Sequence, residues 1–321
     1  MFDLDSFLKS VDPKKNIVVA YSGGGDSTAL LHFCHELKQA KVITGSLSAI
    51  HVNHSISSDS QAWENHCSEF CGQRQIPLII KKVIVESNGA GMESAARQLR
   101  YEAFEQELEL SDQLLLAHHA DDVAETVLFR LFRGTGVEGL QGPMPKRVLG
   151  KSWMLRPWLD VPKIDLSNYL EAHKLEYIED ESNQNNELDR NYIRNKILPI
   201  IANRWPKAAQ KIQQTSGFAA QHSIVMESLL ADKLGDAVRS SMLSRDLLLG
   251  LEGHVCEAAI RFWIKANDIA APNQKILHEI MKAFIRSTPS TSTLVNWSRA
   301  DEAQKGGVLT FVDGALTLNK K

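Results

Sequence analysis

A chain of 321 residues is long enough to form two domains that each bury a hydrophobic core. The hydrophobic fraction of 43% and the charged fraction of 23% are ordinary for a soluble globular protein, and no apolar stretch is long enough to cross a bilayer, which excludes a membrane protein. The net charge of -3 excludes a protein that attracts nucleic acid over its whole surface, so any such contact must be a local basic patch.

The first half of the chain alternates short apolar runs, typical of buried strands, with longer segments of helical periodicity. Strands are expected at residues 17–20, 47–52, 77–85 and 113–117, and helices at residues 27–38, 61–71, 93–110 and 121–132. This alternation predicts the α/β fold class, with a parallel, Rossmann-like sheet, right-handed crossovers and helices on both faces. Ligands bind such sheets at the carboxyl ends of the strands, where three polar clusters follow here, at residues 21–27, 51–54 and 118–122.

The pattern becomes less regular after Gly134. Helices are expected at residues 164–173 and 191–198, and the second of these is expected to end at Pro199 because proline cannot continue a helix from within. Pro206 is a further helix breaker. We therefore place the end of a first, catalytic domain at residue 205.

The C-terminal part, residues 206–321, is expected to be a smaller and mainly helical domain. Ile276, Ile280 and Phe284 recur at the spacing of one helix face. Residues 308–312 and 315–318 flank the turn residues Asp313-Gly314, which predicts a terminal β-hairpin.

The segment between the first expected strand and helix reads Tyr21-Ser22-Gly23-Gly24-Gly25-Asp26-Ser27. Its glycines allow a tight turn that brings backbone N–H groups close to a ligand, and the following helix N-terminus favours negative charge. Ser22 and Ser27 add hydroxyl donors, so the segment predicts a site for a multiply charged anion. Asp26 repels phosphate unless a cation lies between them, so we expect Asp26 to be a ligand of Mg²⁺.

No Gly-Lys-Ser/Thr follows these glycines, so the segment is not a Walker A loop. It matches the Ser-Gly-Gly-x-Asp-Ser pattern of the PP-loop, or N-type, ATP pyrophosphatases, which hold the pyrophosphate of ATP and transfer AMP to a substrate oxygen. This resemblance implies ATP as the nucleotide. It also implies that the phosphates lie on Ser22, Gly23, Gly24, Gly25, Asp26 and Ser27.

Four further segments resemble one group of PP-loop enzymes. They are His51-Val52-Asn53-His54, residues 93–101, residues 116–136 with His118-His119-Ala120-Asp121-Asp122 near their start, and residues 189–199. Together with the glycine-rich loop they resemble the bacterial tRNA(Ile)-lysidine synthetase family over about the first 200 residues. The chain is similar to the short form of that family.

The family resemblance implies a two-step reaction. ATP adenylates the C2 oxygen of the wobble cytidine in an isoleucine tRNA with a CAU anticodon, and the ε-amine of L-lysine then displaces AMP. The resemblance implies Asp26, His118, Asp122, Glu125 and Arg190 as catalytic residues, since the incoming ammonium must be held and must lose a proton. It further implies nucleotide contacts for His51, Asn53, His54 and Arg97, and substrate or tRNA contacts for Arg130, Arg133, Arg156 and Arg194. A monomer and a homodimer both stay open.

Three further features of these segments are a second histidine, a basic stretch and two departures from the family pattern. We interpret His119 as a histidine at the edge of the core with one hydrogen bond rather than as a catalytic group. Residues 190–211 contain six basic residues and no acidic one, which suits contact with an RNA backbone. Two departures from the family pattern are Ser55-Ile56-Ser57, where family members commonly carry an arginine, and Glu181, which replaces a frequent proline.

Three alternative functions stay open. A PP-loop tRNA thiolation enzyme typically needs a Cys-x-x-Cys pair, which the chain lacks. An amidotransferase-linked synthetase needs a glutaminase, which does not fit before Ser22. A nucleotide-binding module without turnover is disfavoured by the clustered acidic, histidine and arginine residues. Four cysteines do not form a disulfide framework and the acidic start is not a secretory signal, so we expect a cytoplasmic protein without a membrane partner.

Overall fold

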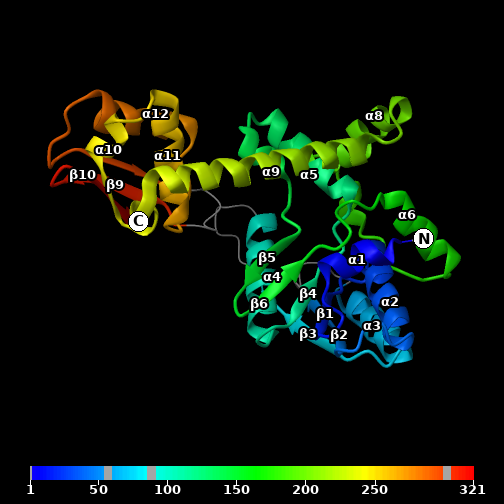
Figure 1. Cartoon of the computed structure of the whole chain (residues 1–321). Helices are drawn as coiled ribbons and strands as arrows, with labels where there is room; N and C mark the ends of the chain where they lie inside the picture. Colours follow the sequence, from blue (N-terminus) through cyan, green and yellow to red (C-terminus); the bar gives the residue numbers. More distant parts are fainter. Residues whose placement is uncertain (1, 54–59, 85–91, 299–304) are drawn as a thin grey trace. The chain divides into compact units, whose positions relative to one another are not determined.

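The computed structural model describes residues 2–53, 60–84, 92–298 and 305–321. The chain forms two compact units, residues 1–221 and 222–321 (Figure 1). The division falls inside the long helix α9 (Ala208–Leu234), whereas the boundary expected from the sequence at residue 205 lies just before this helix. Within the described ranges, no helix has both the length and the hydropathy needed to cross a membrane.

The first unit is built on a six-stranded sheet with the strand order β3-β2-β1-β4-β6-β5. Its strands are β1 (Ile17–Ala20), β2 (Leu47–Asn53), β3 (Leu78–Lys82), β4 (Gln113–Leu115), β5 (Lys146–Leu149) and β6 (Ser152–Leu155). All neighbours are parallel except β5, which runs antiparallel to β6 at the edge. The predicted parallel sheet is confirmed, and four of its strands lie where the sequence pattern placed them.

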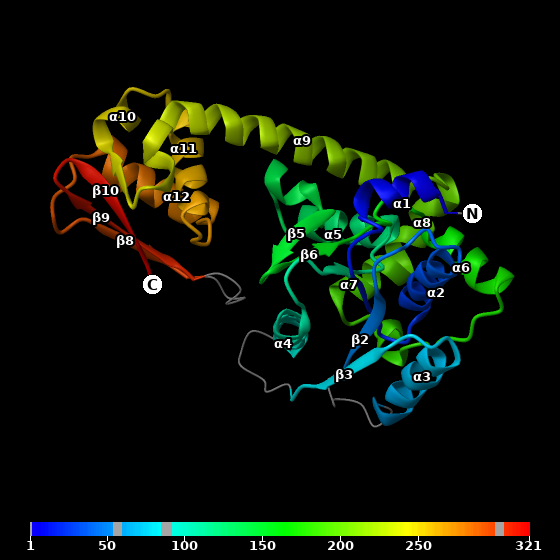
Figure 2. The same cartoon turned by 60° about the horizontal axis from the view of Figure 1, so that its bottom comes forward.

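Helices cover both faces of this sheet, as expected for strands that are apolar on both sides. They are α1 (Leu4–Ser10), α2 (Gly25–Gln39), α3 (Ser60–Gln73), α4 (Met92–Glu107), α5 (Ala120–Phe132) and α6 (Lys163–Ala172). Ile17 and Val19 of β1 pack into the core beneath α2 and α3, while the intervening Val18 packs with Phe104 of α4. Figures 1 and 2 accordingly show α4 on one side of the sheet and α2 and α3 on the other.

A continuous helical segment follows, with short 3₁₀ turns at η1 (Val137–Gln141) and η2 (Glu181–Gln184) before it. It consists of α7 (Asp189–Tyr192), the π-helix η3 (Ile193–Ile197) and α8 (Leu198–Arg204). The expectation that this helix ends at Pro199 was wrong. Pro199 lies in the first turn of α8, directly after the π-helix η3, and the helical segment continues through it to Arg204.

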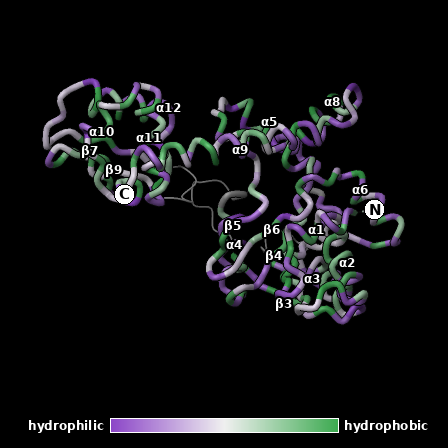
Figure 3. The backbone as a smooth tube through the Cα atoms, viewed as in Figure 1, coloured by the Kyte–Doolittle hydropathy of each residue, from purple (hydrophilic) through white to green (hydrophobic). Residues whose placement is uncertain are grey.

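The second unit packs helices against a four-stranded antiparallel sheet with the order β7-β10-β9-β8. Its elements are η4 (Gly235–Arg239), β7 (Met242–Ser244), α10 (Arg245–Leu249), α11 (Gly253–Ala266), α12 (Gln274–Ile280), the π-helix η5 (Met281–Arg286), β8 (Leu294–Trp297), β9 (Gly307–Val312) and β10 (Ala315–Lys320). The predicted terminal hairpin is confirmed as β9 and β10. Hydrophobic and hydrophilic segments follow one another along the longer helices of both units, as expected for helices that bury one face (Figure 3).

Candidate active site

The candidate site lies at the carboxyl ends of β1 and β4, which are neighbours in the sheet. From β1 the chain builds β2 and β3 on one side, and β4 then pairs with β1 on the other side. Connections that leave two adjacent parallel strands in opposite directions open a crevice at the strand ends, where α/β proteins bind ligands. The glycine-rich loop follows β1 and His118-His119 follows β4, so the fold brings two of the three predicted polar clusters to this point.

The glycine-rich loop has a shape that only small residues permit. Gly23 adopts a φ of +85°, and a Cβ at this position would lie 3.1 Å from the Cys67 Sγ atom. The helix α2 begins at Gly25, and its N-cap Gly24 has no side chain that accepts a hydrogen bond from the first-turn amides. These amides therefore remain open to an anion, and the phosphate site itself stays a prediction.

The two serines of the loop stabilise its shape by hydrogen bonds to each other and to the backbone. Their hydroxyl groups lie 3.0 Å apart, and the Ser22 amide donates to the Ser27 Oγ atom at 3.2 Å. The Ser27 hydroxyl also donates to the Gly24 carbonyl at 2.9 Å. The serines thus stabilise the turn of the loop before any ligand binds, which reduces the conformational entropy lost on binding.

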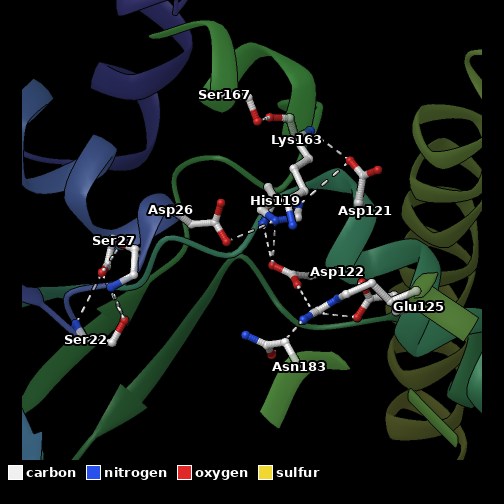
Figure 4. A network of polar contacts seen from close by, with 12 residues as sticks. Ser22, Asp26, Ser27, His119, Asp121, Asp122, Glu125, Lys163, Ser167 and Asn183 are labelled. Atoms are coloured by element: carbon white, nitrogen blue, oxygen red, sulfur yellow. Dashed lines mark hydrogen bonds and ion pairs between the residues drawn. The ribbon is translucent and has the colours of Figure 1, made fainter. Parts of the chain in front are cut away.

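His119 lies at the centre of three carboxylates and connects the glycine-rich loop to α5 (Figure 4). Its Nε2 atom is 3.4 Å from an Asp26 oxygen and 3.6 Å from an Asp122 oxygen, and its Nδ1 atom is 3.8 Å from an Asp121 oxygen. The side chain is only 2% exposed. The interpretation of His119 as a core-edge histidine with one hydrogen bond therefore missed a central residue of the site.

The charged forms of His119 and Asp26 stabilise each other. Burial lowers the pKa of His119, but the carboxylates of Asp26 and Asp122 outweigh burial and raise this pKa above its usual value. Burial raises the pKa of Asp26, but the hydrogen bond and charge of His119 outweigh it and hold this pKa below its usual value. The cluster therefore favours an ionised Asp26 beside a positively charged imidazole.

Asp122 is oriented by the start of α5. The His119 backbone N–H donates to the Asp122 carboxylate at 3.0 Å, which caps the helix and fixes the side chain. The second Asp122 oxygen accepts from the Arg194 guanidinium at 3.3 Å. Asp122 thus faces the histidine on one side and an arginine on the other.

Arg194 also forms a two-point ion pair with Glu125. Its Nε and Nη2 atoms donate to the two Glu125 oxygens at 2.6 and 2.8 Å, a fork geometry that strengthens the contact. Arg194 belongs to the π-helix η3, and such irregular turns often occur at functional sites. Burial raises the pKa of Glu125 and outweighs the opposing effect of Arg194. The structure therefore brings together three predicted residues, with Arg194 in contact with both acids.

His118 and Arg156 form a second pair beside this cluster. The Arg156 Nε atom donates to His118 Nδ1 at 3.0 Å, and the Nη1 atom donates to the Met144 carbonyl at 2.6 Å. Arg156 is only 5% exposed. Its guanidinium contacts His118 and the Met144 carbonyl, and the expected contact with the substrate or the tRNA stays a prediction. Burial is the main cause that lowers the pKa of His118 to about 4.

The predicted nucleotide contacts at the end of β2 are directed into the protein. His51 is buried and its Nδ1 atom donates to the Tyr21 carbonyl at 2.9 Å, next to the glycine-rich loop. The Asn53 amide donates to Glu64 at 3.1 Å. Arg97 is exposed, with its guanidinium 5.4 Å from the Tyr101 ring centre. The predicted contact His54 and the departure at Ser55-Ile56-Ser57 lie outside the described residues.

The remaining predicted arginines gather around the C-terminal half of α5. The guanidinium groups of Arg133 and Arg190 lie 5.0 and 5.6 Å from the ring centre of Phe129. Arg130 donates to the Gly139 carbonyl at 3.0 Å. These residues form a basic surface on α5 and α7, at a helix C-terminus where positive charge is favoured.

The donor set around Asp26 suits a magnesium ion bound together with phosphates. Nowhere in the described ranges do three His, Cys, Asp or Glu side chains form a group that holds a metal alone. Mg²⁺ in nucleotide sites commonly takes one or two carboxylates and completes its shell with phosphate oxygens and water. Asp26 is 41% exposed and lies in the first turn of α2, next to the open loop amides. It therefore fits the role of such a single carboxylate ligand.

Comparison with known protein families identifies the first unit. The family model described as a PP-loop domain matches residues 2–201. A tRNA(Ile)-lysidine synthase from Legionella pneumophila (strain Paris) is 36% identical over 286 residues, which cover 89% of this chain and 65% of that protein. This chain thus spans slightly less than two thirds of that relative. A tRNA(Ile)-lysidine synthase from Coxiella burnetii (strain RSA 493) is 34% identical over 312 residues, which cover 97% of this chain and 69% of that protein.

A solved structure shows the same fold at lower identity. The U34-tRNA thiolase NcsA from Methanococcus maripaludis superposes with a TM-score of 0.54 and 18% identity, over 68% of this chain and 77% of that chain. Identity at this level supports the fold alone. The family match over most of the first unit and the relatives that align beyond it carry more weight. The chain belongs to the PP-loop domain family and, within it, to the tRNA(Ile)-lysidine synthase family.

Proposed function

We propose that the protein is an ATP-dependent tRNA(Ile)-lysidine synthase, a ligase that acts in the cytoplasm. It would adenylate the C2 oxygen of the wobble cytidine of an isoleucine tRNA with a CAU anticodon and then join L-lysine through its ε-amine. The products would be lysidine-containing tRNA, AMP and pyrophosphate. The observation that carries the proposal is the position of the phosphate loop and of the Asp122–Glu125 pair at one end of the β1–β4 strand pair.

The first step needs a leaving pyrophosphate whose charge is stabilised. The open amides at the start of α2 and the Ser22 hydroxyl are proposed to donate to phosphate oxygens, while the Ser27 hydroxyl, which donates to the Gly24 carbonyl, maintains the shape of the loop. Asp26 would hold Mg²⁺, which neutralises phosphate charge when it is bound. His119 holds the Asp26 carboxylate in its ionised form.

The second step needs a lysine ε-amine without its extra proton. Asp122 and Glu125 are proposed to receive the ε-ammonium, and the site already holds a cation of similar charge, the Arg194 guanidinium. The raised pKa of Glu125 suits it to accept the proton, because a weaker acid is a stronger base. The free amine then attacks C2, the new C–N bond forms, and the C2–O bond breaks so that AMP leaves with the oxygen.

The basic surface around Phe129 is proposed to contact the tRNA backbone. Arg130, Arg133 and Arg190 supply its charge, and the exposed Trp205 lies in the basic stretch of residues 190–211 that also contains Arg190. Aromatic and arginine side chains are the groups on which unstacked RNA bases stack. A local patch of this kind reconciles an RNA partner with the net charge of -3.

The alternative of tRNA thiolation is disfavoured by the state of the cysteines. All four are buried and free, and burial raises the pKa of each thiol, to about 12 for Cys67 and Cys71 and to about 11 for Cys256. Reactive cysteines have low pKa values and are accessible. The chain therefore shares a fold with a thiolase, but its cysteines are not suited to sulfur transfer.

The proposal is tested by mixing the purified protein with Mg²⁺-ATP, radiolabelled lysine and unmodified isoleucine tRNA with a CAU anticodon. Initiator methionine tRNA is the control. We expect lysine on the isoleucine tRNA alone, with one AMP released for each lysine attached. AMP release without lysine transfer would support the adenylation step but exclude lysine as the nucleophile. The absence of AMP would contradict the proposed reaction.

A further inference from the structure

The pair of Arg156 and His118 fixes where the proton of the His118 ring lies. The Arg156 Nε atom is 3.0 Å from His118 Nδ1. A guanidinium group only donates hydrogen bonds and is not deprotonated in proteins, so His118 Nδ1 must be the acceptor and carries no proton. The neutral ring therefore carries its proton on Nε2.

Arg156 is held too firmly to release the ring. Its Nη1 atom donates to the Met144 carbonyl at 2.6 Å, and its Nη2 atom lies 3.3 Å from the Met154 sulfur. A hydrogen bond with Tyr101 also acts on the same guanidinium. A buried guanidinium that turned away would leave several donors without partners, which is unfavourable. His118 is thus locked in one tautomer.

The groups that face His118 also keep it neutral. Burial is the largest influence and lowers its pKa, and the positive charges of Arg156, Arg97 and His119 act in the same direction. Asp122 alone among the named neighbours acts in the opposite direction. A neutral ring whose Nδ1 is already occupied has no free basic nitrogen, so it is poorly suited to take a proton from lysine.

The other side of the ring is available to a substrate. Among the described residues, no protein group makes a hydrogen bond with His118 Nε2, and the side chain is only partly buried. His118 directly precedes His119 and follows β4, so it borders the crevice that contains the phosphate loop. The Nε2–H group is therefore a fixed donor at the edge of the candidate site.

We propose that His118 acts as a neutral hydrogen-bond donor, through Nε2–H, to a phosphoryl oxygen of the reacting adenylate, and not as the base for lysine. This inference rests on the proposed function. When the amine attacks C2 and the C2–O bond breaks, the electron pair of that bond leaves with the AMP oxygen. A donor already oriented toward this group stabilises the new charge, while Glu125 holds the proton that it has taken from the ε-ammonium.

Two substitutions separate a donor from a base. In His118→Gln, the side-chain oxygen can accept from Arg156 while the amide N–H donates in place of Nε2–H, and no titratable group remains. We expect the rate of lysine transfer in single turnover to fall less than about 10-fold in His118→Gln and about 100-fold or more in His118→Ala. Equal and severe losses in both variants would show that a titrating ring is needed and would overturn the donor role.

The tautomer is tested without any reaction. In ¹⁵N spectra of the histidine-labelled protein, with the His118 signals identified by their loss in His118→Gln, we expect an unprotonated Nδ1 and a protonated Nε2 from pH 8 to pH 5. A protonated Nδ1, or a midpoint close to the ordinary histidine pKa of about 6.5, would overturn the assignment. If wild-type protein transfers no lysine, the proposed function fails, while the spectra still decide whether Arg156 fixes the ring.

Discussion

The two sheets of the molecule place their polar side chains differently. In the parallel sheet of residues 1–221, β1 and β4 run side by side in the same direction, so Asp26 and His119 meet at one edge although they are distant in the sequence. In the antiparallel sheet of residues 222–321, neighbouring strands run in opposite directions, so groups that follow successive strands end at opposite edges. Parallel pairing thus concentrates charge for chemistry, whereas the second sheet mainly covers a core.

That core consists of large apolar side chains. Trp263, Ile260 and Phe284 are completely buried against Leu309 and Leu316 of the sheet. We therefore expect substitutions at the strand ends of the first sheet to change catalysis with little effect on stability. Substitutions beneath the second sheet should do the reverse.

The largest effect is expected at Asp26. Asp26→Ala should reduce pyrophosphate release by about a thousandfold or more, because it removes the proposed metal ligand beside the leaving group. The fold should persist, since the side chain is partly exposed and contributes no core packing. A matched control is Asp165→Ala, which removes an exposed aspartate from the first turn of α6. Wild-type turnover by Asp26→Ala would show that Asp26 is not a metal ligand.

In the second unit, substitution of Trp263 is expected to reduce stability without affecting nucleotide binding. Trp263→Ala should destabilise the protein by about 3–5 kcal/mol, because it leaves a cavity and frees the Ser240 carbonyl from its hydrogen bond with the indole. Binding of an ATP analogue to the first unit should persist. Urea unfolding and analogue titration measure the two properties separately. Trp205→Ala, at an exposed tryptophan, should change stability by less than about 0.5 kcal/mol. Equal losses in the free energy of unfolding of the two variants would show that burial of Trp263 does not determine its contribution to stability.

An intermediate effect is expected from pH, through His32 of α2. His32 is buried, its Nδ1 atom lies 2.8 Å from the Tyr169 hydroxyl, and burial lowers its pKa to about 4. Because this folded-state pKa lies below the unfolded value of about 6.5, the unfolded state binds the proton more readily. Stability should be complete above pH 6.5 and should decrease as the pH falls toward 4.

The size of this effect follows from the two pKa values. Between pH 7.5 and pH 5 the loss from His32 should be about 2 kcal/mol, and the lowered pKa of His118 acts in the same direction. Urea unfolding at both pH values measures it, and His32→Asn should lose part of the dependence. An identical pH dependence in His32→Asn would show that His32 does not titrate on unfolding.

How far the sequence predicts this molecule depends on whether a signal is local. The strand β1 was predicted with its observed ends because all four residues are apolar and the first three are buried, while β5 was missed because three of its four residues are exposed at the sheet edge. β7 and β8 were missed because they are short and half exposed. The confirmed hairpin has a local turn signal in Asp313-Gly314.

The same distinction holds at the site. The glycine-rich loop was recognisable because its residues are consecutive, and the acids of α5 because they share one helix. The contacts of His119 with Asp26 and of Arg156 with His118 join separate strands, so no spacing in the sequence reveals them. Two adjacent histidines directly after a buried strand were the only local sign that both rings face the crevice.

The smallest effect is expected at Arg190, on the basic surface rather than at the strand ends. Its guanidinium lies 5.6 Å from the Phe129 ring centre, and we propose that it contacts the tRNA backbone near the reacting nucleotide. Loss of one such contact costs about 1.4 kcal/mol, so Arg190→Ala should slow adenylation at subsaturating tRNA about 10-fold and leave ATP binding unchanged. The loss should shrink at higher salt, where counterion release contributes less to wild-type binding. Arg286→Ala, which removes an exposed arginine of the second unit, is the control. An unchanged single-turnover rate at every tRNA concentration would place Arg190 outside the RNA contact and would confine the functional surface of the first unit to the carboxyl ends of β1 and β4.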